Sequence, residues 1–240
     1  MPKAKYHKIY NDLRNKIENE YEYGELLPTE KELTKTYQSS RNTVRRAITK
    51  LASEGYVQSV QGMGVRNIYE PTTRTNFKIG EIESFREASN RNGLRTETKV
   101  IEFNQVIVDE KMSKLTSFPE GATVFKITRV HYINGVPLII NHNYFLKDAV
   151  GDLTVEIASA SIYDYLENVV KLTIINAKQT MYIDYMTEED QKYIDMGDYN
   201  CMAVVSSNTY NSDGVMFEYT ESRHHPTHFR FHVNALRKPQ

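Results

Sequence analysis

The stretch from residue 29 to residue 66 limits the fold more than any other part of this chain. Thr29 and Glu32 have the spacing of a capping box, in which each side chain satisfies a backbone donor left free at the start of a helix. A tight connection leads from this short helix to Ser40, a good N-cap for the next one. The second helix is expected to end near Gly55, in a left-handed C-cap. Two short helices joined by a tight turn are typical of a helix-turn-helix.

The second of these helices has two unlike faces. Its apolar stripe consists of Val44, Ala47, Ile48, Leu51 and Ala52. The opposite face and the first turn beside it carry Arg41, Asn42, Thr43, Arg45, Arg46 and Thr49. Because an arginine can bind guanine O6 and N7 through two hydrogen bonds, this face is predicted to enter the major groove of DNA. Exposed arginines on a helix are more often merely solvated. Here the capping box, the short turn, the arginine face and a glycine-containing hairpin follow one another in the order of a DNA-binding winged helix, and this order favours DNA binding.

Two strand-like runs follow, over residues 56–60 and 65–69, and the segment Gln61-Gly62-Met63-Gly64 joins them. Glycines permit a sharp reversal and let the backbone approach a phosphate chain closely. The hairpin is therefore predicted to be the wing of a winged helix.

Charge divides the chain in two. Residues 31–66 carry seven Lys and Arg against two Asp and Glu, whereas residues 71–240 carry 18 against 22. The formal net charge of −1 excludes a polycation that coats nucleic acid through bulk charge alone. A polar, Pro-containing segment near residue 70 lacks apolar periodicity and is typical of a linker. The predicted division is a DNA-binding domain over 1–69, a linker over 70–77 and a larger domain over 78–240.

The larger domain has the pattern of an α+β fold around one antiparallel sheet. Its clearest signal is Asn134-Gly135 between two β-rich runs, which predicts a hairpin. A helical segment is predicted within 77–92 and helices over 161–169 and 187–196. Strands are predicted over 100–108, 123–133, 136–146, 173–186, 201–210, 215–222 and 229–235.

One predicted strand of this domain mixes charged and apolar side chains on a single face. Strand alternation places Phe125, Ile127, Arg129, His131 and Ile133 together. Arg129 and His131 are costly to bury unless they meet an anion. Ser161 opens a helix whose free backbone N–H groups favour an anionic ligand. The alternative is purely structural: Ser161 caps its own helix with Asp164 as the N3 partner, and Arg129 pairs with a local carboxylate.

Other chemistries find little support. His224, His225 and His228 are close enough in sequence to suggest zinc, but Pro226 and adjacent arginines favour a solvated turn, so no metal and no cofactor are expected. No nucleophile elbow, Walker loop or zincin motif is present, so no catalytic residues are expected. A single cysteine, Cys201, and the lack of a long apolar run are typical of a cytoplasmic protein.

The motifs of the first 70 residues resemble a known family. The runs 27–33, 40–47, 51–55 and 61–64, LPTEKEL, SRNTVRRA, LASEG and QGMG, are similar to the winged helix of GntR-family transcription regulators. The resemblance implies operator contacts from Lys31, Arg41, Thr43, Arg45 and Gly62, with Gln61 beside them in the wing. Lys31 stands where the family usually has arginine, and a lysine keeps the charge but loses the two-pronged hydrogen bond.

The chain after residue 77 resembles the UTRA effector domain of the HutC subfamily, which is similar in fold to chorismate lyase but senses small molecules. The resemblance implies effector contacts from Ser84, Phe85, Arg129, His131, Ser161, Tyr163 and Glu218. Relatives that sense amino-sugar phosphates have a second arginine at the position of His131. Arg86 and Arg223 are therefore candidates to supplement the phosphate contact.

Two further segments, 80–87 and 217–224, resemble the trehalose operon repressors, which respond to trehalose 6-phosphate; the tail from His228 onwards departs from that pattern. The resemblance implies a repressor of a trehalose uptake or utilisation operon, with double-stranded operator DNA and a sugar phosphate as its partners. Because one winged helix reads only a short half-site, a homodimer paired through the larger domain is predicted. Two alternatives remain at this point. One is a HutC-type regulator for another sugar phosphate, such as an amino-sugar phosphate, and the other is an enzyme similar to chorismate lyase.

Overall fold

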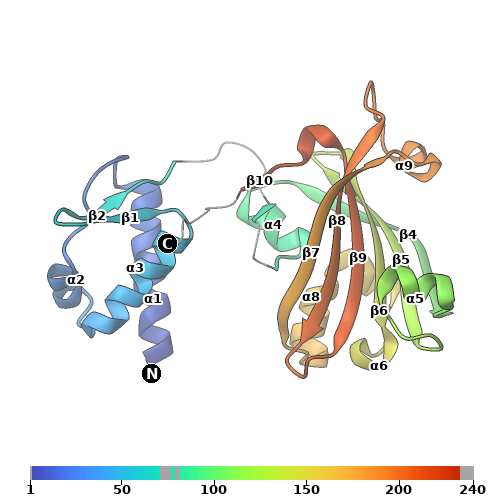
Figure 1. The fold of residues 1–240 in the computed structure, drawn as a ribbon, viewed down its shortest axis with the longest axis horizontal. Coiled ribbons are helices and arrows are strands. Elements are labelled where there is room, and N and C mark those ends of the chain that lie inside the picture. Colours follow the sequence, from blue (N-terminus) through green and yellow to red (C-terminus); the bar gives the residue numbers. More distant parts are fainter. Residues whose placement is uncertain (1, 71–76, 79–81, 233–240) are drawn as a thin grey trace. The chain divides into compact units, whose positions relative to one another are not determined.

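The computed structural model describes residues 2–70, 77–78 and 82–232, and these residues belong to two compact units (Figure 1). The first unit contains three helices and a two-stranded hairpin among its described residues. They are α1 (Pro2–Asn19), α2 (Glu30–Thr36), α3 (Arg41–Ser53), β1 (Val57–Val60) and β2 (Gly64–Asn67). This is the order of a winged helix-turn-helix.

The two helix starts of the first unit are built as the sequence predicts. The Thr29 backbone N–H donates to the Glu32 carboxylate at 2.8 Å, and the Glu32 N–H donates to Thr29 Oγ1 at 3.3 Å, which confirms the capping box. Ser40 Oγ accepts from the Thr43 N–H at 3.2 Å and caps α3. Gly55 has a φ of +80°, as a left-handed C-cap requires. These caps fix where α2 and α3 begin and therefore which residues α3 exposes.

The core of the first unit joins the three helices and the hairpin. Its buried members are Ile9, Leu13, Ile17, Leu27, Leu33, Val44, Ala47, Ile48, Leu51, Tyr56 and Val57. Four of them come from the predicted apolar stripe of α3, so the opposite face of that helix remains at the surface.

The second unit is an α+β fold around a six-stranded antiparallel sheet in the order β4-β5-β6-β9-β8-β7 (Figure 1). The sheet strands are β4 (Thr96–Ile107), β5 (Thr123–Ile133), β6 (Val136–Leu146), β7 (Ile174–Tyr185), β8 (Cys201–Asn211) and β9 (Met216–His224). The helices are α4 (Phe85–Arg91), α5 (Glu110–Thr116), α6 (Lys147–Val150), α7 (Val155–Ala160), α8 (Ile162–Tyr165) and α9 (Glu188–Tyr193), with a π-helix at Leu166–Val170 and a 3-10 helix at Pro226–His228. Short strands β3 (Phe77–Lys78) and β10 (Phe231–His232) pair with each other.

Both faces of the six-stranded sheet carry a core. On one face, Ile127 and Phe145 pack against Ile162 and Leu166 of the segment from α8 onwards. On the other face, Val130, Ile140, Met202 and Val204 pack against Ile194 and Met196, which follow α9. Because successive side chains of a strand point to opposite faces of the sheet, an odd or even position in the strand decides which of the two cores a side chain joins. The predicted hairpin is confirmed, with φ of +51° at Asn134 and +84° at Gly135.

Several predicted boundaries differ from the structure. The helical segment expected within 77–92 is α4, which begins at Phe85 because Ser84 and Glu87 form a capping box there, while Phe77–Lys78 is a strand. Of the strand expected over 229–235, the structure describes only the short β10, and residues 233–235 lie outside the described residues. Residues 71–76 of the expected linker also lie outside the described residues. The short helices α5 and α7, capped by Asp109 and Thr154, were not predicted.

Candidate functional site

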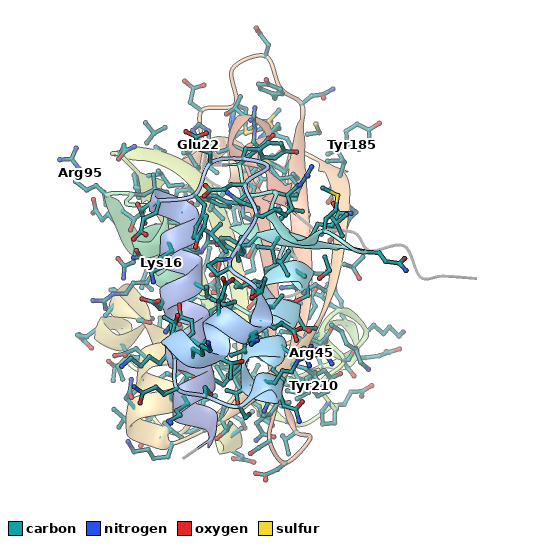
Figure 2. All side chains as sticks on the ribbon, turned by 90° about the vertical axis from the view of Figure 1, so that its left-hand side faces the viewer. Lys16, Glu22, Arg45, Arg95, Tyr185 and Tyr210 are labelled. Carbon is teal, nitrogen blue, oxygen red and sulfur yellow. The ribbon has the colours of Figure 1, made fainter. Side chains whose placement is uncertain are left out.

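The first candidate site is the exposed face of α3. Arg41 and Arg45 are both largely exposed, with 73% and 62% of their side chains accessible, and both meet Glu30 of α2. Arg41 Nε donates to Glu30 Oε2 at 2.8 Å, and Arg45 Nε donates to Glu30 Oε1 at 3.1 Å. The hydrogen bonds from Arg41 and Arg45 lower the pKa of Glu30. One carboxylate therefore holds both guanidinium groups, at the surface where Figure 2 labels Arg45.

The remaining DNA-binding candidates also lie at the surface of this unit. Lys31 and Asn42 are exposed, Thr43 is half-buried, and the guanidinium of Arg46 lies 5.0 Å from the ring centre of Tyr6. Gln61 and Gly62 are exposed at the turn between β1 and β2. Gly62 has a φ of +78°, and a Cβ built there meets nothing within 4 Å, so backbone conformation rather than crowding explains the glycine.

Glu30 is not predicted from the sequence to belong to this site. It lies at the first position of α2, one residue after the N-cap, where an acidic residue is ordinarily explained by the helix dipole. Its contact with α3 depends on how the two helices pack, which the sequence pattern alone does not give.

The second candidate site is a cavity of about 690 Å³ in the second unit, on the face of the sheet that carries α7 and α8. Strands β4, β5, β6, β9, β8 and β7 all contribute side chains to it, and the rest come from α4 and the residues on either side of it, from the end of α7 and from α8 with its N-cap. The lining includes eight of the nine predicted effector-binding residues, namely Ser84, Phe85, Arg86, Arg129, His131, Ser161, Tyr163 and Glu218. The structure thus brings together residues that are up to 134 positions apart, from Ser84 to Glu218.

The register of the strands orders this cavity floor from one end to the other. His131 lies opposite Ile139, which in turn lies opposite His224. The next row along the same face is Arg129, Asn141 and Ser222. The rows after it contain Asn143 with Thr220, and then Phe145 with Glu218. The floor therefore changes from imidazole and guanidinium groups, through hydroxyls and amides, to a carboxylate.

Arg129 is the cation of this floor. Its Nε donates to Asn143 Oδ1 at 3.0 Å, and its Nη1 donates to the backbone oxygen of Ala158 at 3.4 Å. Burial lowers the pKa of Arg129 to about 10, and the negative charge of Glu218 partly offsets this shift. The guanidinium therefore stays protonated at neutral pH. Both hydrogen-bond partners are neutral, which leaves the positive charge available to an anion in the cavity.

A hydrogen-bond chain leads from Arg129 to the acidic end. The Asn143 amide donates to Thr220 Oγ1 at 2.7 Å, and the Thr220 hydroxyl donates to Glu218 Oε1 at 2.7 Å. The Tyr163 hydroxyl donates to Glu218 Oε2 at 2.6 Å, and burial together with the Glu218 charge raises the pKa of Tyr163 well above its usual value. Such a network fixes the orientation of each side chain that a ligand would meet.

His131, Ser161 and Ser84 also have partners within the protein. His131 Nδ1 lies 2.9 Å from Thr98 Oγ1, and the imidazole ring packs on Phe85 at 4.2 Å between centres. Ser161 Oγ accepts from the Asp164 N–H at 3.3 Å, so Ser161 caps its own helix, as the purely structural alternative predicts. Ser84 caps α4 in the same way. Both serines nevertheless line the cavity.

The prediction for Arg223 needs correction, because Arg223 does not line the cavity. Its guanidinium is 4% exposed and donates to Asp190 at 2.9–3.1 Å, with further contacts to Asp184 at 3.1 Å and Glu221 at 3.2 Å. On β9 the even positions from Glu218 to His224 enter the cavity. Arg223 lies one position out of phase and points to the opposite face of the sheet.

Several polar members of the cavity are not predicted from the sequence. Asn141, Asn143, Gln179, Thr220, Ser222 and His224 all line it. Strand parity relative to Arg129 and Glu218 is the signal that could have found those on β6 and β9. His224, considered above for a metal, is buried in the wall, where burial lowers its pKa to about 3. Among the residues that the structure describes, no group of three or more His, Cys, Asp or Glu could hold a metal ion.

Comparison with known proteins follows the division into two units. Residues 5–66 match the family model "Bacterial regulatory proteins, gntR family", and residues 91–230 match the UTRA domain. The chain is 34% identical to the HTH-type transcriptional regulator TreR of Bacillus subtilis (strain 168), over 93% of each chain. It is 27% identical to the mannosyl-D-glycerate transport/metabolism system repressor MngR of Escherichia coli (strain K12), over 98% of each.

Solved structures show the same fold. The crystal structure of the possible transcriptional regulator YydK from Bacillus subtilis has a TM-score of 0.80 at 22% identity, covering 97% of this chain and 99% of that one. The effector-binding domain of the B. subtilis trehalose repressor TreR has a TM-score of 0.55 at 31% identity, covering 60% of this chain and all but 1% of its own.

These matches assign a task to each unit. The helix-turn-helix binds DNA, and the UTRA domain binds a small effector. The protein is a transcriptional regulator rather than an enzyme, which removes the chorismate-lyase alternative. Within the described part of the chain, no helix has the length and apolar character that crossing a membrane requires. The chain belongs to the GntR family of bacterial transcription regulators, in its UTRA-containing HutC subfamily.

Proposed function

We propose that this regulator represses a trehalose uptake or utilisation operon and leaves its operator when trehalose 6-phosphate binds the UTRA cavity. The observation that carries the proposal is the cavity floor, on which a half-buried, charged Arg129 adjoins a continuous set of hydroxyl, amide and carboxylate groups. The 34% identity to TreR of B. subtilis, and the 31% identity to the effector domain of the trehalose repressor from that organism, support the sugar.

The floor suggests how such a ligand is held. Arg129 attracts the phosphate, with Arg86, Ser84 and Ser161 around it, and Glu218 accepts hydrogen bonds from sugar hydroxyls. A volume of about 690 Å³ lies within the range of small-molecule sites, roughly 300–1,000 Å³. The carboxylate disfavours a second anionic group at its end, so the ligand carries its charge at one end only.

Repression needs two copies of the chain in this proposal. One winged helix recognises a short half-site, and a homodimer paired through the UTRA domain would place two α3 helices one DNA turn, about 34 Å, or a multiple apart. Lys31, Arg41, Thr43, Arg45 and the wing at Gly62 are proposed to contact the operator. Effector binding would change the segment over 70–77 so that the two helices no longer match the half-sites.

The test of the effector is titration calorimetry of the full chain with trehalose 6-phosphate, glucosamine 6-phosphate, trehalose and inorganic phosphate. Trehalose 6-phosphate should bind tightest, because it alone supplies both the anion and the disaccharide hydroxyls. Arg129→Ala should weaken trehalose 6-phosphate by about 2–5 kcal/mol, the cost of removing one partner of a buried charged contact, and should spare operator binding.

The exposed Arg230→Ala is the matched control and should keep the wild-type affinity. If the chain binds glucosamine 6-phosphate tightly and does not bind trehalose 6-phosphate, its effector is an amino-sugar phosphate and the proposed effector is wrong. Normal trehalose 6-phosphate binding by Arg129→Ala would place the anion elsewhere in the cavity.

A further inference from the structure

An acidic side chain of α2 lies against the exposed face of α3. Glu30 Oε2 accepts from Arg41 Nε at 2.8 Å, and Glu30 Oε1 accepts from Arg45 Nε at 3.1 Å. Each oxygen of the carboxylate thus holds one guanidinium group, and 24% of the Glu30 side chain remains accessible. A carboxylate is an unexpected group on a surface that binds DNA, because the phosphates of the duplex repel it.

The stability of the free protein gives only a weak reason for this arrangement. Arg41 is the first residue of α3, where the helix dipole disfavours a positive charge, and Arg45 follows one turn later on the same side. Glu30 offsets both repulsions, but ion pairs of exposed side chains contribute little to folding. Two cations and an anion kept together at the surface therefore indicate a role in binding.

The contacts with Glu30 leave the same end of each guanidinium group free of hydrogen bonds. Both arginines donate through Nε, and among the described residues neither Arg41 nor Arg45 donates through Nη1 or Nη2. These two nitrogens form the forked end that can bind guanine O6 and N7 together. The hydrogen bonds from the arginines lower the pKa of Glu30, so the carboxylate is ionised at neutral pH. Glu30 thus fixes both guanidinium planes and leaves available the end that can read a base.

The charge of Glu30 acts differently on two kinds of DNA complex. Binding to a random sequence depends almost entirely on phosphate contacts and on the release of counterions. Glu30 offsets one of the two positive charges of Arg41 and Arg45, so it weakens these contacts. In an operator complex the guanidinium ends would meet base edges, and side chains that are already fixed lose less entropy there. A group that weakens the wrong complex more than the right one raises specificity.

We propose that Glu30 is a specificity-determining residue, which weakens binding of the winged helix to random duplex more than binding to the operator by directing Arg41 and Arg45 to base edges instead of phosphates. The inference rests on the operator contacts proposed for Arg41 and Arg45, and it adds how the chain rejects other sequences. It requires no contact between Glu30 and a base.

The experiment compares Glu30→Gln with the wild type in the full chain, because glutamine keeps the shape and removes the charge. Fluorescence anisotropy measures affinity for a random duplex and for the fragment upstream of the neighbouring genes that the wild type retards specifically. Glu30→Gln should bind the random duplex about fivefold more tightly and the specific fragment within about threefold of the wild type. The logarithm of its affinity for random duplex should fall more steeply with the logarithm of salt concentration, by roughly 0.9 in slope for one added phosphate contact.

Two further variants separate the charge of Glu30 from its place in the fold. The matched control Glu20→Gln removes the same charge from an exposed position after α1 and should leave the ratio of the two affinities unchanged. Glu30→Asp keeps the charge and should keep the affinity for random duplex close to that of the wild type. In an Arg45→Ala background, Glu30→Gln should change the ratio less than it does in the wild type, because one of its two partners is absent.

The outcomes separate this inference from the proposed operator contacts. An unchanged ratio for Glu30→Gln, an equal change for Glu20→Gln, or a melting temperature of Glu30→Gln far below that of the wild type would overturn the role of Glu30 and leave the arginine contacts standing. If Arg41→Ala and Arg45→Ala both bind the specific fragment as tightly as the wild type, the operator contacts are wrong and this inference fails with them. A wild type that prefers no fragment over random duplex would overturn both.

Discussion

At the residue scale, Arg41 and Arg45 are held by one carboxylate before DNA arrives. Glu30 spans both guanidinium groups from α2, while both arginines remain more than half exposed. A side chain held in place loses less conformational entropy when it binds, so this arrangement would favour the proposed contacts of Arg41 and Arg45 with DNA. It also means that either arginine can change partner without breaking the core of the unit.

Substitution of Arg45 tests whether it contacts a base or only the phosphate chain. Arg45→Ala should weaken operator binding by about 1–3 kcal/mol, the value of a good two-pronged base contact. Arg45→Lys should restore little of it if the contact is to guanine, and most of it if a point charge near phosphate suffices. Fluorescence anisotropy on labelled operator measures both variants. Equal affinity for Arg45→Ala and wild type would remove Arg45 from the DNA-contacting residues.

The buried histidines of the cavity predict a pH dependence of stability. Burial lowers the pKa of His224 to about 3 and, with the charges of Arg129 and His224, lowers that of His131 as well. The unfolded chain takes up protons below about pH 6.5 and the folded chain does not. The free energy of unfolding should therefore be at its full value above pH 6.5 and fall by up to about 1.4 kcal/mol per pH unit per histidine below it.

Urea unfolding followed by circular dichroism at pH 8, 7, 6 and 5 measures this slope. His131→Gln should make the slope shallower, whereas the exposed His7→Gln should leave it as it is. A free energy of unfolding that stays constant from pH 7 to pH 5 would show that the histidines are protonated in the folded protein.

Some residues of the cavity could be predicted from the sequence and others could not. Arg129 and His131 could be placed on one face because strand alternation is a local rule. The same rule applied from Glu218 would have excluded Arg223, which is out of phase by one position. Strand parity could have placed Asn141 on the cavity face, but the lack of a hydrogen-bond partner for its Oδ1 is recognised only when every neighbour around it is known.

At the element scale, α9 is tied to the sheet by one buried ion pair. Asp190 is 1% exposed, closes the capping box with Thr187, and accepts from Arg223 of β9. Asp184 contacts the same guanidinium, but 48% of its side chain is exposed. Burial, rather than the number of contacts, should decide what each carboxylate contributes.

Removing Asp190 should therefore be costly and removing Asp184 should not. Asp190→Ala should lower the free energy of unfolding by about 3–5 kcal/mol, because it leaves a buried guanidinium without its main partner. Asp184→Ala should lower it by less than about 1 kcal/mol, as for an exposed ion pair. Chemical denaturation of both variants at one pH gives the comparison. Similar losses for the two would mean that solvent reaches Arg223 as readily as it reaches Asp184.

Elements with strong local signals could be predicted, and elements that depend on packing could not. The capping boxes at Thr29 and Thr187 and the Asn134-Gly135 turn are encoded within a few residues. The short helix α7 has six residues, too few for helical periodicity to stand out, and its place is fixed by packing of Ala158 in the core under the sheet.

At the scale of the whole molecule, two domains with different tasks belong to one chain. A winged helix that binds DNA precedes a UTRA domain that binds an effector. Coupling between two such sites is reciprocal, so an effector that weakens operator binding must itself bind less tightly to the operator complex. A coupling free energy of about 1–3 kcal/mol changes either affinity about 5–150-fold. This range is enough to change operator occupancy without unfolding either unit.

The most direct measurement is a mobility shift of the full chain on DNA from upstream of its neighbouring genes, with and without trehalose 6-phosphate. The protein should retard a specific fragment in excess random duplex, and trehalose 6-phosphate should weaken that complex about 5–150-fold while trehalose does not. Retardation that shows no preference over random duplex, or a specific complex that no sugar phosphate weakens, would contradict the account.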